Sequence, residues 1–381
     1  MAGLPFLDDN TSGRTSVSRP TATVKFGASA PSSGFGGLVD AVTSVLAGTP
    51  GDPLRDHLQS LRVRRVLAPE VDVLELFVAA ISTAPAVALA DEGTLALTDS
   101  DGKEVAVFKG HIDGIHERAQ GTRLVTVTNG GRELAQARLN RSFEQQDAGQ
   151  ILQALVAELG LKCSLPSGAP MLPRLVVDDA LSLYTHIARL AALSGFVVCM
   201  GADGSVKVKD PTASAQPTAR IAFGVDLLDF SLGSRGIHTA AVQVTGEGAA
   251  GDQGSDAWYW LRKDPTANQS QAGSGTPQRS YSNAVLRSAD DVATVARVKL
   301  QRAAEAATRG WLLVAGVPQV EPGDNVLLSG MPQSSSNGTY RVEEIQHDYA
   351  AQLGFRSRLR VVNVSAAGAA GGLTGLLGGL L

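Results

Sequence analysis

Few residues of this 381-residue chain stand in a pattern that could do chemistry. The segment GEGAAG (246–251) matches the glycine pattern of a dinucleotide-binding loop and follows a predicted strand. Such a loop holds a pyrophosphate only where a helix begins directly after it. The next residues, DQGSD, do not favour a helix. The segment is therefore interpreted as a turn, and no cofactor is expected.

Histidines and carboxylates offer no better site. His111 and His116 lie five residues apart on a predicted strand, and this odd spacing puts them on opposite faces, so they cannot hold one metal ion together. The chain also lacks the common zinc-binding motifs, and no metal site is expected. Asp178 and Asp179 stand at the start of a predicted helix, where capping explains them better than acid–base catalysis. Because no nucleophile elbow or phosphate loop is present either, the sequence predicts no enzymatic activity.

An arginine-rich strand near the end of the chain could instead meet a partner. In FRSRLR (355–360) the side chains alternate, so that Arg356, Arg358 and Arg360 share one face. Two interpretations remain open: a solvated outer face, or an interface or channel wall that meets acidic groups.

Two apolar features allow a similar choice. Trp258 and Trp260 flank Tyr259, and this segment belongs either to a core or to an exposed aromatic patch. The last residues are rich in glycine, yet leucines recur there with the period of one helix face. We expect this tail either to be disordered or to become ordered only in an assembly, by docking its leucines on a partner protein. Its leucines are Leu373, Leu376, Leu377, Leu380 and Leu381.

The composition indicates a folded, mildly acidic protein. Hydrophobic residues make up 44% of the chain, enough to fill sizeable cores. The net charge of −4 argues against a general nucleic-acid binder, which would carry a basic surplus. Cys163 and Cys199 are too few for a disulfide framework and are expected as buried thiols of a protein assembled in a reducing cytoplasm. Neither a signal peptide nor a membrane helix is expected.

Hydrophobic periodicity predicts the elements that must position these residues. Short alternating segments bounded by turn residues fill both ends of the chain and predict β-barrels or sandwiches. Segments 225–233 and 238–246 are both assigned to the second of these blocks. The sequence thus predicts a β-rich α+β fold, with two similar β-barrel, tube-like domains flanking a small α+β domain. The expected parts are an N-terminal arm (1–20), a first barrel (21–135), an α+β domain (136–225), a second barrel with a long loop and a helix (226–365) and a Gly/Leu-rich tail (366–381).

Three helices are expected from the apolar spacing and from capping residues. The first is capped by Asp147, and the second opens at Asp178 or Asp179. The third begins at Ser288 in a sequence similar to a capping box and ends at Gly310.

Several segments of the chain share an order and spacing that point to a known family. Near the C-terminus they are V-P-x-V-x-P-G-D at Val317–Asp324, G-x-Y-x-V at Gly338–Val342, His347, and Gly354 with Phe355. Further upstream they are VFKGHIDGI (107–115), DAGQILQALVAELGL (147–161), LYTHIARLAALSGFVVCM (183–200) and AAVQVTGEG (240–248). Together these segments resemble the phage late-control protein D family of tail hub proteins. Relatives of that family are the hub half of the VgrG spike proteins and the hubs of contractile injection systems.

The resemblance implies a structural role in a tail baseplate. Three copies, each with two similar barrels, form a pseudo-six-fold ring that joins a six-fold inner tube to a three-fold spike. The implied partners are the chain itself as a homotrimer, an inner tube or tube-initiator protein, a separate spike protein and other baseplate proteins. No specific nucleic acid and no direct membrane insertion are implied. Such a protein is assembled in the bacterial cytoplasm and becomes part of a phage virion or of a contractile injection particle.

Two other functions remain open from the sequence. A glycan-binding tail-tip protein would use exposed aromatic residues such as Trp258 and Trp260 as a sugar platform. A tail-associated cell-wall hydrolase would need two facing carboxylates or a metal triad.

Overall fold

The computed structural model describes ten segments, which contain mostly β-strands. The described residues are 21–27, 57–79, 87–99, 101–119, 121–166, 169–211, 216–234, 239–247, 265–350 and 354–364.

Six strands form the first barrel, in the spatial order β1-β4-β5-β6-β3-β2. Neighbouring strands are antiparallel throughout. Alternate residues point inward, so that Leu74 and Leu76 on β3 meet Val125 and Val127 on β6 in one buried core. The strands are β1 (Ala22–Gly27), β2 (Leu58–Val66), β3 (Val73–Ala79), β4 (Glu92–Thr98), β5 (Glu104–Arg118) and β6 (Thr122–Thr128).

Six further strands form the second barrel. Its core contains Leu312, Val326, Ile345 and Leu359, all of them fully buried. The strands are β12 (Ala219–Ala222), β13 (Leu227–Ser234), β17 (Thr308–Ala315), β18 (Asn325–Ser329), β19 (Gly338–Ala350) and β20 (Gly354–Asn363).

The two barrels share one order of strands. A long bulged strand, β5 or β19, forms a hairpin with β6 or β20, and each hairpin has three residues between its strands. Beyond the hairpin, β3 and β2 in the first barrel correspond to β17 and β13 in the second. On the other side, β4 corresponds to β18. The predicted pair of similar barrels is therefore confirmed. One difference is that β12 runs parallel to β18, whereas β1 is antiparallel to β4.

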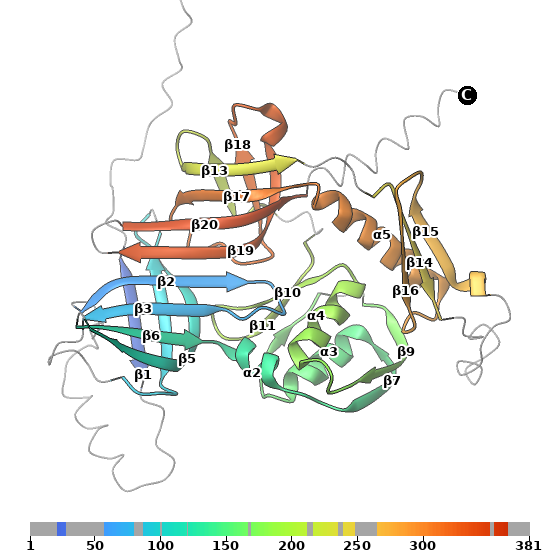
Figure 1. Cartoon of the computed structure of the whole chain (residues 1–381), viewed down its shortest axis with the longest axis horizontal. Helices are drawn as coiled ribbons and strands as arrows, with labels where there is room; N and C mark the ends of the chain where they lie inside the picture. Colours follow the sequence, from blue (N-terminus) through green and yellow to red (C-terminus); the bar gives the residue numbers. More distant parts are fainter. Residues whose placement is uncertain are drawn as a thin grey trace, which may run out of the picture.

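One pairing joins the barrels. Strand β2 lies antiparallel to β19, from Ser60 opposite Ala350 to Val66 opposite Glu344. The two barrels therefore belong to a single 12-stranded sheet. In Figure 1, β13, β17, β20, β19, β2, β3 and β6 follow one another in this sheet, with β13 at the end of the second barrel.

The predicted α+β unit lies beside the first barrel (Figure 1). Helices α3 and α4 pack on each other over one core that includes Leu155 and Ile187. Both cysteines lie in this unit as free thiols, Cys199 buried and Cys163 half-buried. Its elements are α2 (Gly130–Gln136), β7 (Arg141–Asp147), α3 (Ala148–Ala157), β8 (Cys163–Ser164), β9 (Met171–Val177), α4 (Leu183–Leu193), β10 (Val197–Met200) and β11 (Val206–Lys209).

The starts of the helices agree with the sequence in two cases and differ in one. Asp147 caps α3 in a complete capping box with Gln150. Helix α4, however, begins later than predicted, because Ser182 accepts the backbone N–H of Thr185 as its N-cap. The predicted cap Asp178 instead accepts the backbone N–H of Ala180, in the turn that precedes the helix.

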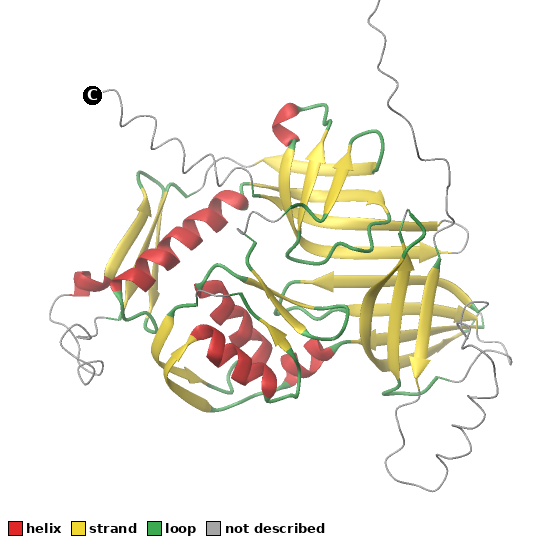
Figure 2. Cartoon of the chain, turned by 180° about the vertical axis from the view of Figure 1, so that it is seen from behind, coloured by secondary structure: helices red, strands yellow, loops and turns green. Residues whose placement is uncertain are grey.

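A small third unit interrupts the second barrel. Segment 238–246 was assigned to that barrel, but its strand β14 (Ala241–Gly246) forms a separate sheet with β15 (Gln269–Gly273) and β16 (Gln278–Asn283). Helix α5 (Ala289–Glu305) covers this sheet, as Figure 2 shows. Its residues Val292, Val295 and Ala296 pack into a shared core with Val242 and Val244 of β14. Two short 3-10 turns complete the described elements, η3 (Pro265–Asn268) and η4 (Ser334–Ser336).

Helix α5 begins as predicted and ends earlier. Ser288 accepts the backbone N–H of Asp291. The helix ends at Glu305, and Gly310 lies inside β17 and not at a helix end. Glycine is needed there because a Cβ atom would lie only 1.8 Å from the carbonyl oxygen of Ser231 on β13. Within the described segments, no helix is long and apolar enough to cross a membrane.

Candidate functional site: a polar face across both barrels

The three arginines singled out from the sequence lie on the outer face of β20. Arg356, Arg358 and Arg360 are exposed, whereas Ser357 and Leu359 between them are buried. The alternation is thus as predicted. Its use as an interface or channel wall stays a prediction.

Neighbouring strands extend this face over both barrels. Across the sheet, Arg358 lies opposite Leu313 on β17 and opposite Gln346 on β19, which in turn faces Arg64 on β2. The next row brings Arg356, Asp348 and Arg62 together, followed by Glu75 on β3. Because all these side chains point away from the two cores, we call them the polar face. It is defined by Arg62, Arg64, Glu75, Arg309, Trp311, Glu344, Gln346, Asp348, Arg356, Arg358 and Arg360.

Ion pairs on the polar face bind the two barrels to each other. Arg62 Nε lies 2.9 Å from Asp348 Oδ1, and Arg64 Nε lies 2.9 Å from Glu344 Oε1. Both pairs cross from β2 to β19. Burial raises the pKa of Glu344, but the hydrogen bond and charge of Arg64 outweigh it, and the net pKa is lowered. Exposed pairs of this kind contribute at most about 1 kcal/mol each, so their main effect is to fix the register of the junction.

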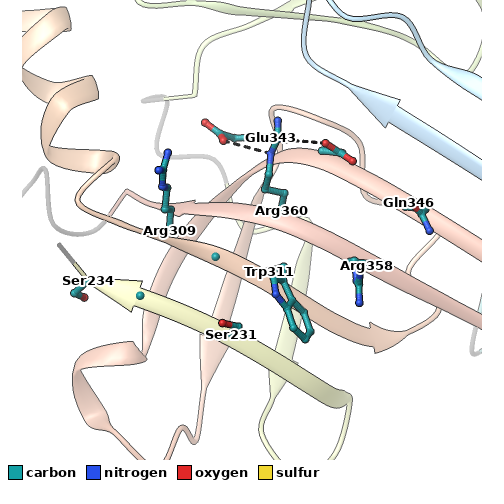
Figure 3. A pocket seen from close by; sticks show the side chains of 11 residues that line it. Ser231, Ser234, Arg309, Trp311, Glu343, Gln346, Arg358 and Arg360 are labelled. Atoms are coloured by element: carbon teal, nitrogen blue, oxygen red, sulfur yellow. Dashed lines mark ion pairs between the residues drawn. The ribbon is translucent and has the colours of Figure 1, made fainter.

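A hollow of about 880 Å³ lies on this face over β13, β17, β20 and β19. Figure 3 shows Arg309, Trp311, Arg358 and Arg360 around it, with Arg360 held by two acidic residues of β19. The guanidinium carbon of Arg358 lies 4.8 Å from the centre of the Trp311 ring, a cation–π contact. Arg309, Arg356 and Arg358 form no ion pair with any described residue. The hollow therefore offers free positive charge next to an aromatic ring.

A buried charge cluster lies behind the polar face, where three units meet. Arg65 of β2 is only 1% exposed; its Nη2 donates to the carbonyl oxygen of Met200 at 2.6 Å and to Glu321 Oε1 at 3.2 Å. Glu321 also accepts from Lys207 and Lys209 of β11 at 2.9 and 3.1 Å. The cluster therefore ties the first barrel, the α+β unit and the loop before β18 of the second barrel.

Asp72 completes the charge cluster on the side of the first barrel. Its carboxylate accepts the backbone N–H of Val66 at 2.8 Å and the side-chain amide of Asn129 at 2.9 Å. Burial raises the pKa of Asp72 to about 6, although the nearby Arg65 acts in the opposite direction. Burial likewise raises the pKa of Glu321, yet Arg65 and the two lysines prevail and lower it to about 2.

Sequence reasoning missed this cluster, although two signals were present. In LRVRRV, Arg64 and Arg65 are adjacent, so that both cannot point to solvent from one strand. Glu321 and Asp324 belong to the V-P-x-V-x-P-G-D segment, which had been used only as a family signature.

His347, part of the same resemblance, is fully buried where the two barrel cores meet. Its Nδ1 lies 2.8 Å from the hydroxyl oxygen of Ser357, and its ring centre lies 5.4 Å from that of Phe355. Burial lowers the pKa of His347 to about 3, so the ring is neutral at physiological pH. We interpret His347 as a packing residue of the junction.

One expectation about histidines was wrong. A bulge at Asp113 shifts the alternation of β5, and His111 pairs with Thr128 while His116 pairs with Leu124. The even spacing of these two partners on β6 puts both histidines on the same face, roughly 13 Å apart along the strand. Among the described residues, no three side chains of His, Cys, Asp or Glu lie close enough to hold a metal ion.

Other residues singled out from the sequence lie outside the described segments. These are the aromatic residues Trp258, Tyr259 and Trp260, the tail leucines Leu373, Leu376, Leu377, Leu380 and Leu381, and most of the glycine segment 246–251, of which only the first two residues are described.

Solved structures with the same arrangement define the class of fold, that of phage tail proteins. The 43 kDa tail protein of prophage MuSo2 from Shewanella oneidensis is 12% identical, with a TM-score of 0.63 over 91% of this chain and 99% of that one. The tail protein from Neisseria meningitidis MC58 is 11% identical, with a TM-score of 0.64 over 92% of this chain and 98% of that one. The E. coli c3393 protein, a component of the type VI secretion system described as similar to the T4 tail proteins gp27 and gp5, is 11% identical; its TM-score is 0.54 over 82% of this chain and 74% of that one.

The chain belongs to the family of the Alg8 N-terminal domain, which it matches over residues 100–351. No curated protein matches the sequence. The resemblance to tail proteins is thus confirmed at the level of the fold, whereas the late-control protein D family itself is not confirmed.

Proposed function

We propose that this chain is the structural baseplate hub of a contractile tail or contractile injection system. Three copies form a ring of six barrels, which joins a six-fold inner tube to a three-fold spike. One observation carries the proposal: two barrels with the same strand order are joined by β2 and β19 into a single sheet with a continuous polar face. The similarity of the fold to phage tail proteins supports it.

The duplicated barrel gives a physical reason for such a role. A trimer whose subunits each carry two equivalent barrels presents six similar surfaces on one side while keeping three-fold symmetry. The polar face then serves as the wall of the ring, where alternating acidic and basic side chains keep water bound. The partners of the ring are a tube or tube-initiator protein, a separate spike protein and other baseplate proteins. The particle is a phage virion or an injection machine assembled in the bacterial cytoplasm.

This role needs no catalysis, and we propose that the chain is not an enzyme. The hollow over β17 and β20 brings arginines, a tryptophan and two paired glutamates together. Those glutamates, Glu343 and Glu344, both interact with Arg360. They therefore lack the separated, facing arrangement that glycoside hydrolysis requires.

Sedimentation velocity over a concentration series, together with negative-stain microscopy, tests the proposal. We expect particles with the mass of three chains of 39.4 kDa each and a central hole. A chain that stays monomeric at every concentration, or one that forms six-membered rings, would contradict the hub. Binding of the monomer to purified glycans would favour the tail-tip function, and turnover of peptidoglycan would favour the hydrolase.

A further inference from the structure

The junction inside the chain is a template for a contact between chains. Within one copy, β2 at the edge of the first barrel pairs with β19 of the second barrel. The equivalent of β2 in the second barrel is β13, and the equivalent of β19 in the first barrel is β5. In the order of the sheet, β13 is the last strand at the end of the second barrel, whereas β5 lies on the far side of the first barrel between β4 and β6.

Strand β13 is an edge that a monomer would have to protect. It pairs with β17 on one side, and the only other pairing among the described residues is an isolated bridge between Leu227, at the start of the strand, and Phe223. Its sequence LLDFSLGS has one charged residue and neither lysine nor proline, the usual protections of an exposed edge. Three large apolar side chains are exposed here: Leu228 on the strand itself at 59%, and Phe223 at 43% and Val225 at 70% in the turn before it. An exposed apolar cluster beside a free edge marks a protein contact.

The second half of β5 has the complementary opening. Residues Glu104–His111 pair with β4, whereas His111–Arg118 pair with β6. After the bulge at Asp113, the side of β5 that faced β4 therefore has no described strand. In β19, the corresponding segment is the one that pairs with β2.

Counting from the two hairpins gives the register. The last pairs, Arg118 with Thr122 and Ala350 with Gly354, are equivalent, so His116 corresponds to Asp348. On the partner strands, Thr126 and Arg358 each lie four residues after these last pairs and are therefore equivalent. Across the sheet, Thr126 leads through Glu75 to Arg62, and Arg358 leads through Leu313 to Asp229, so Asp229 corresponds to Arg62.

Arg62 lies opposite Asp348 within one copy, so a contact between copies that repeats this junction places Asp229 of one copy opposite His116 of the next. The contact again pairs an acidic with a basic residue, but the acidic residue now stands on the equivalent of β2 and the basic residue on the equivalent of β19. One position further along, half-buried Phe230 lies opposite half-buried Ile115, as Val63 lies opposite His347. The next pair on the polar face is Ser231 opposite Gly114.

We propose that β13 of one copy pairs antiparallel with residues Gly114–Arg118 of β5 in a second copy, with Asp229 opposite His116. The contact rests on the proposed ring, and it is head-to-tail, because each copy contributes one strand of each kind. It extends the polar face from one copy to the next and covers the apolar cluster beside β13.

Paired cysteines test the register. In a chain with both Asp229→Cys and His116→Cys, the directly opposite Cβ atoms are about 4.5–5.5 Å apart, and a shift of about 1 Å brings them to the 3.5–4.5 Å spacing of a disulfide. Mild oxidation should then shift the band on a denaturing gel from one chain to a covalently closed trimer, and Ser231→Cys with Gly114→Cys should do the same. The mismatched pair Asp229→Cys with Gly114→Cys is offset by roughly 7 Å along the strands and should lose the cross-linked band. Each single variant controls for the native thiols.

A charge exchange gives an independent measurement on the unoxidised protein. Asp229→Lys should reduce trimer formation in sedimentation, and the added His116→Asp should restore it.

The outcomes separate this inference from the proposed function. If the protein is a trimer but neither matched pair forms a disulfide, or the mismatched pair gives the same yield, the β13–β5 contact is overturned. The proposed hub function is not affected by that result. A ladder of cross-linked chains that extends beyond the trimer supports the contact and contradicts the closed ring. A monomer without cross-links overturns both.

Discussion

Replacing Arg65 by methionine should destabilise the protein more than any comparable change on the polar face. The guanidinium is 1% exposed and contacts Asp72, Glu321 and the carbonyl oxygen of Met200. Methionine fills a similar volume without the charge, so cavity formation adds little. Removing one partner of a buried ion pair costs about 3–5 kcal/mol, because the remaining charge stays buried.

The loss should arise mainly at Asp72. Glu321 keeps Lys207 at 2.9 Å and Lys209 at 3.1 Å after the substitution, whereas Arg65 is the only cation paired with Asp72 in the described part of the chain. We therefore expect a loss near the lower end of the range, about 3 kcal/mol. The matched control is Arg62→Met on the same strand. Its side chain is 53% exposed and pairs with Asp348, and its removal should cost at most about 1 kcal/mol.

The pH dependence of the deficit identifies Asp72 as its source. Burial already raises the pKa of Asp72 to about 6, and Arg65 opposes this rise. In the variant the pKa should rise further. When the pKa of a carboxyl group is higher in the folded than in the unfolded state, its contribution to stability is fully present at pH values below the unfolded pKa, about 3.9. That contribution is lost as the pH rises through the folded pKa. The deficit should therefore be large at pH 8 and small near pH 5.

Urea unfolding of the two variants and the parent at pH 5 and pH 8 measures this deficit. Adding Asp72→Asn to Arg65→Met should recover at least about 1 kcal/mol at pH 8, because it removes the unpaired charge. Equal losses for Arg65→Met and Arg62→Met, or a deficit that is the same at both pH values, would refute the reasoning.

Three further predictions concern other parts of the chain. Gly310→Ala should cost about 1–3 kcal/mol of stability by overpacking, because its Cβ atom would meet the Ser231 carbonyl oxygen. The same change should speed hydrogen exchange in β13. The control Gly233→Ala lies on the neighbouring strand with open space around it and should change stability by less than about 0.5 kcal/mol. The pKa of Glu321, about 2, lies below its ordinary value. Its ionised carboxylate therefore stabilises the fold fully above about pH 4.3, and this stabilisation should be lost as the pH falls toward 2. In acid titrations of stability, Glu321→Gln should abolish this pH-dependent loss. Deleting residues 366–381 should leave the thermal unfolding temperature unchanged and reduce retention of the spike in assembled particles, and normal spike occupancy would contradict the predicted docking of the tail.

The regular part of the fold could be predicted because alternation and capping are local signals. Arg356, Arg358 and Arg360 show this, since their shared face follows from period two alone. The helix cap at Asp147 was found for the same reason. The bulge at Asp113 could not be predicted, because an extra residue in a strand leaves no mark in the hydrophobic pattern, and so the faces of His111 and His116 were assigned wrongly.

Long-range features were beyond sequence reasoning for a different reason. Strand β14 alternates like a barrel strand, but its membership in a separate sheet depends on α5, which covers that sheet. Two of the partners of Arg65, Met200 and Glu321, come from segments 135 and 256 residues away. Only the two adjacent arginines hinted that one of them turns inward.

The junction between β2 and β19 also sets an order of events during synthesis. The pair Arg64–Glu344 spans 280 residues, so the ribosome must add all of these residues before β2 acquires its neighbour. Contacts of such long sequence separation form late, because the entropy of closing the intervening loop must be overcome first. Until then the nascent first barrel has an open edge at β2, and the shared face does not exist. A chain interrupted before β19 therefore has no complete face to offer, and truncated copies are kept out of any assembly that depends on it.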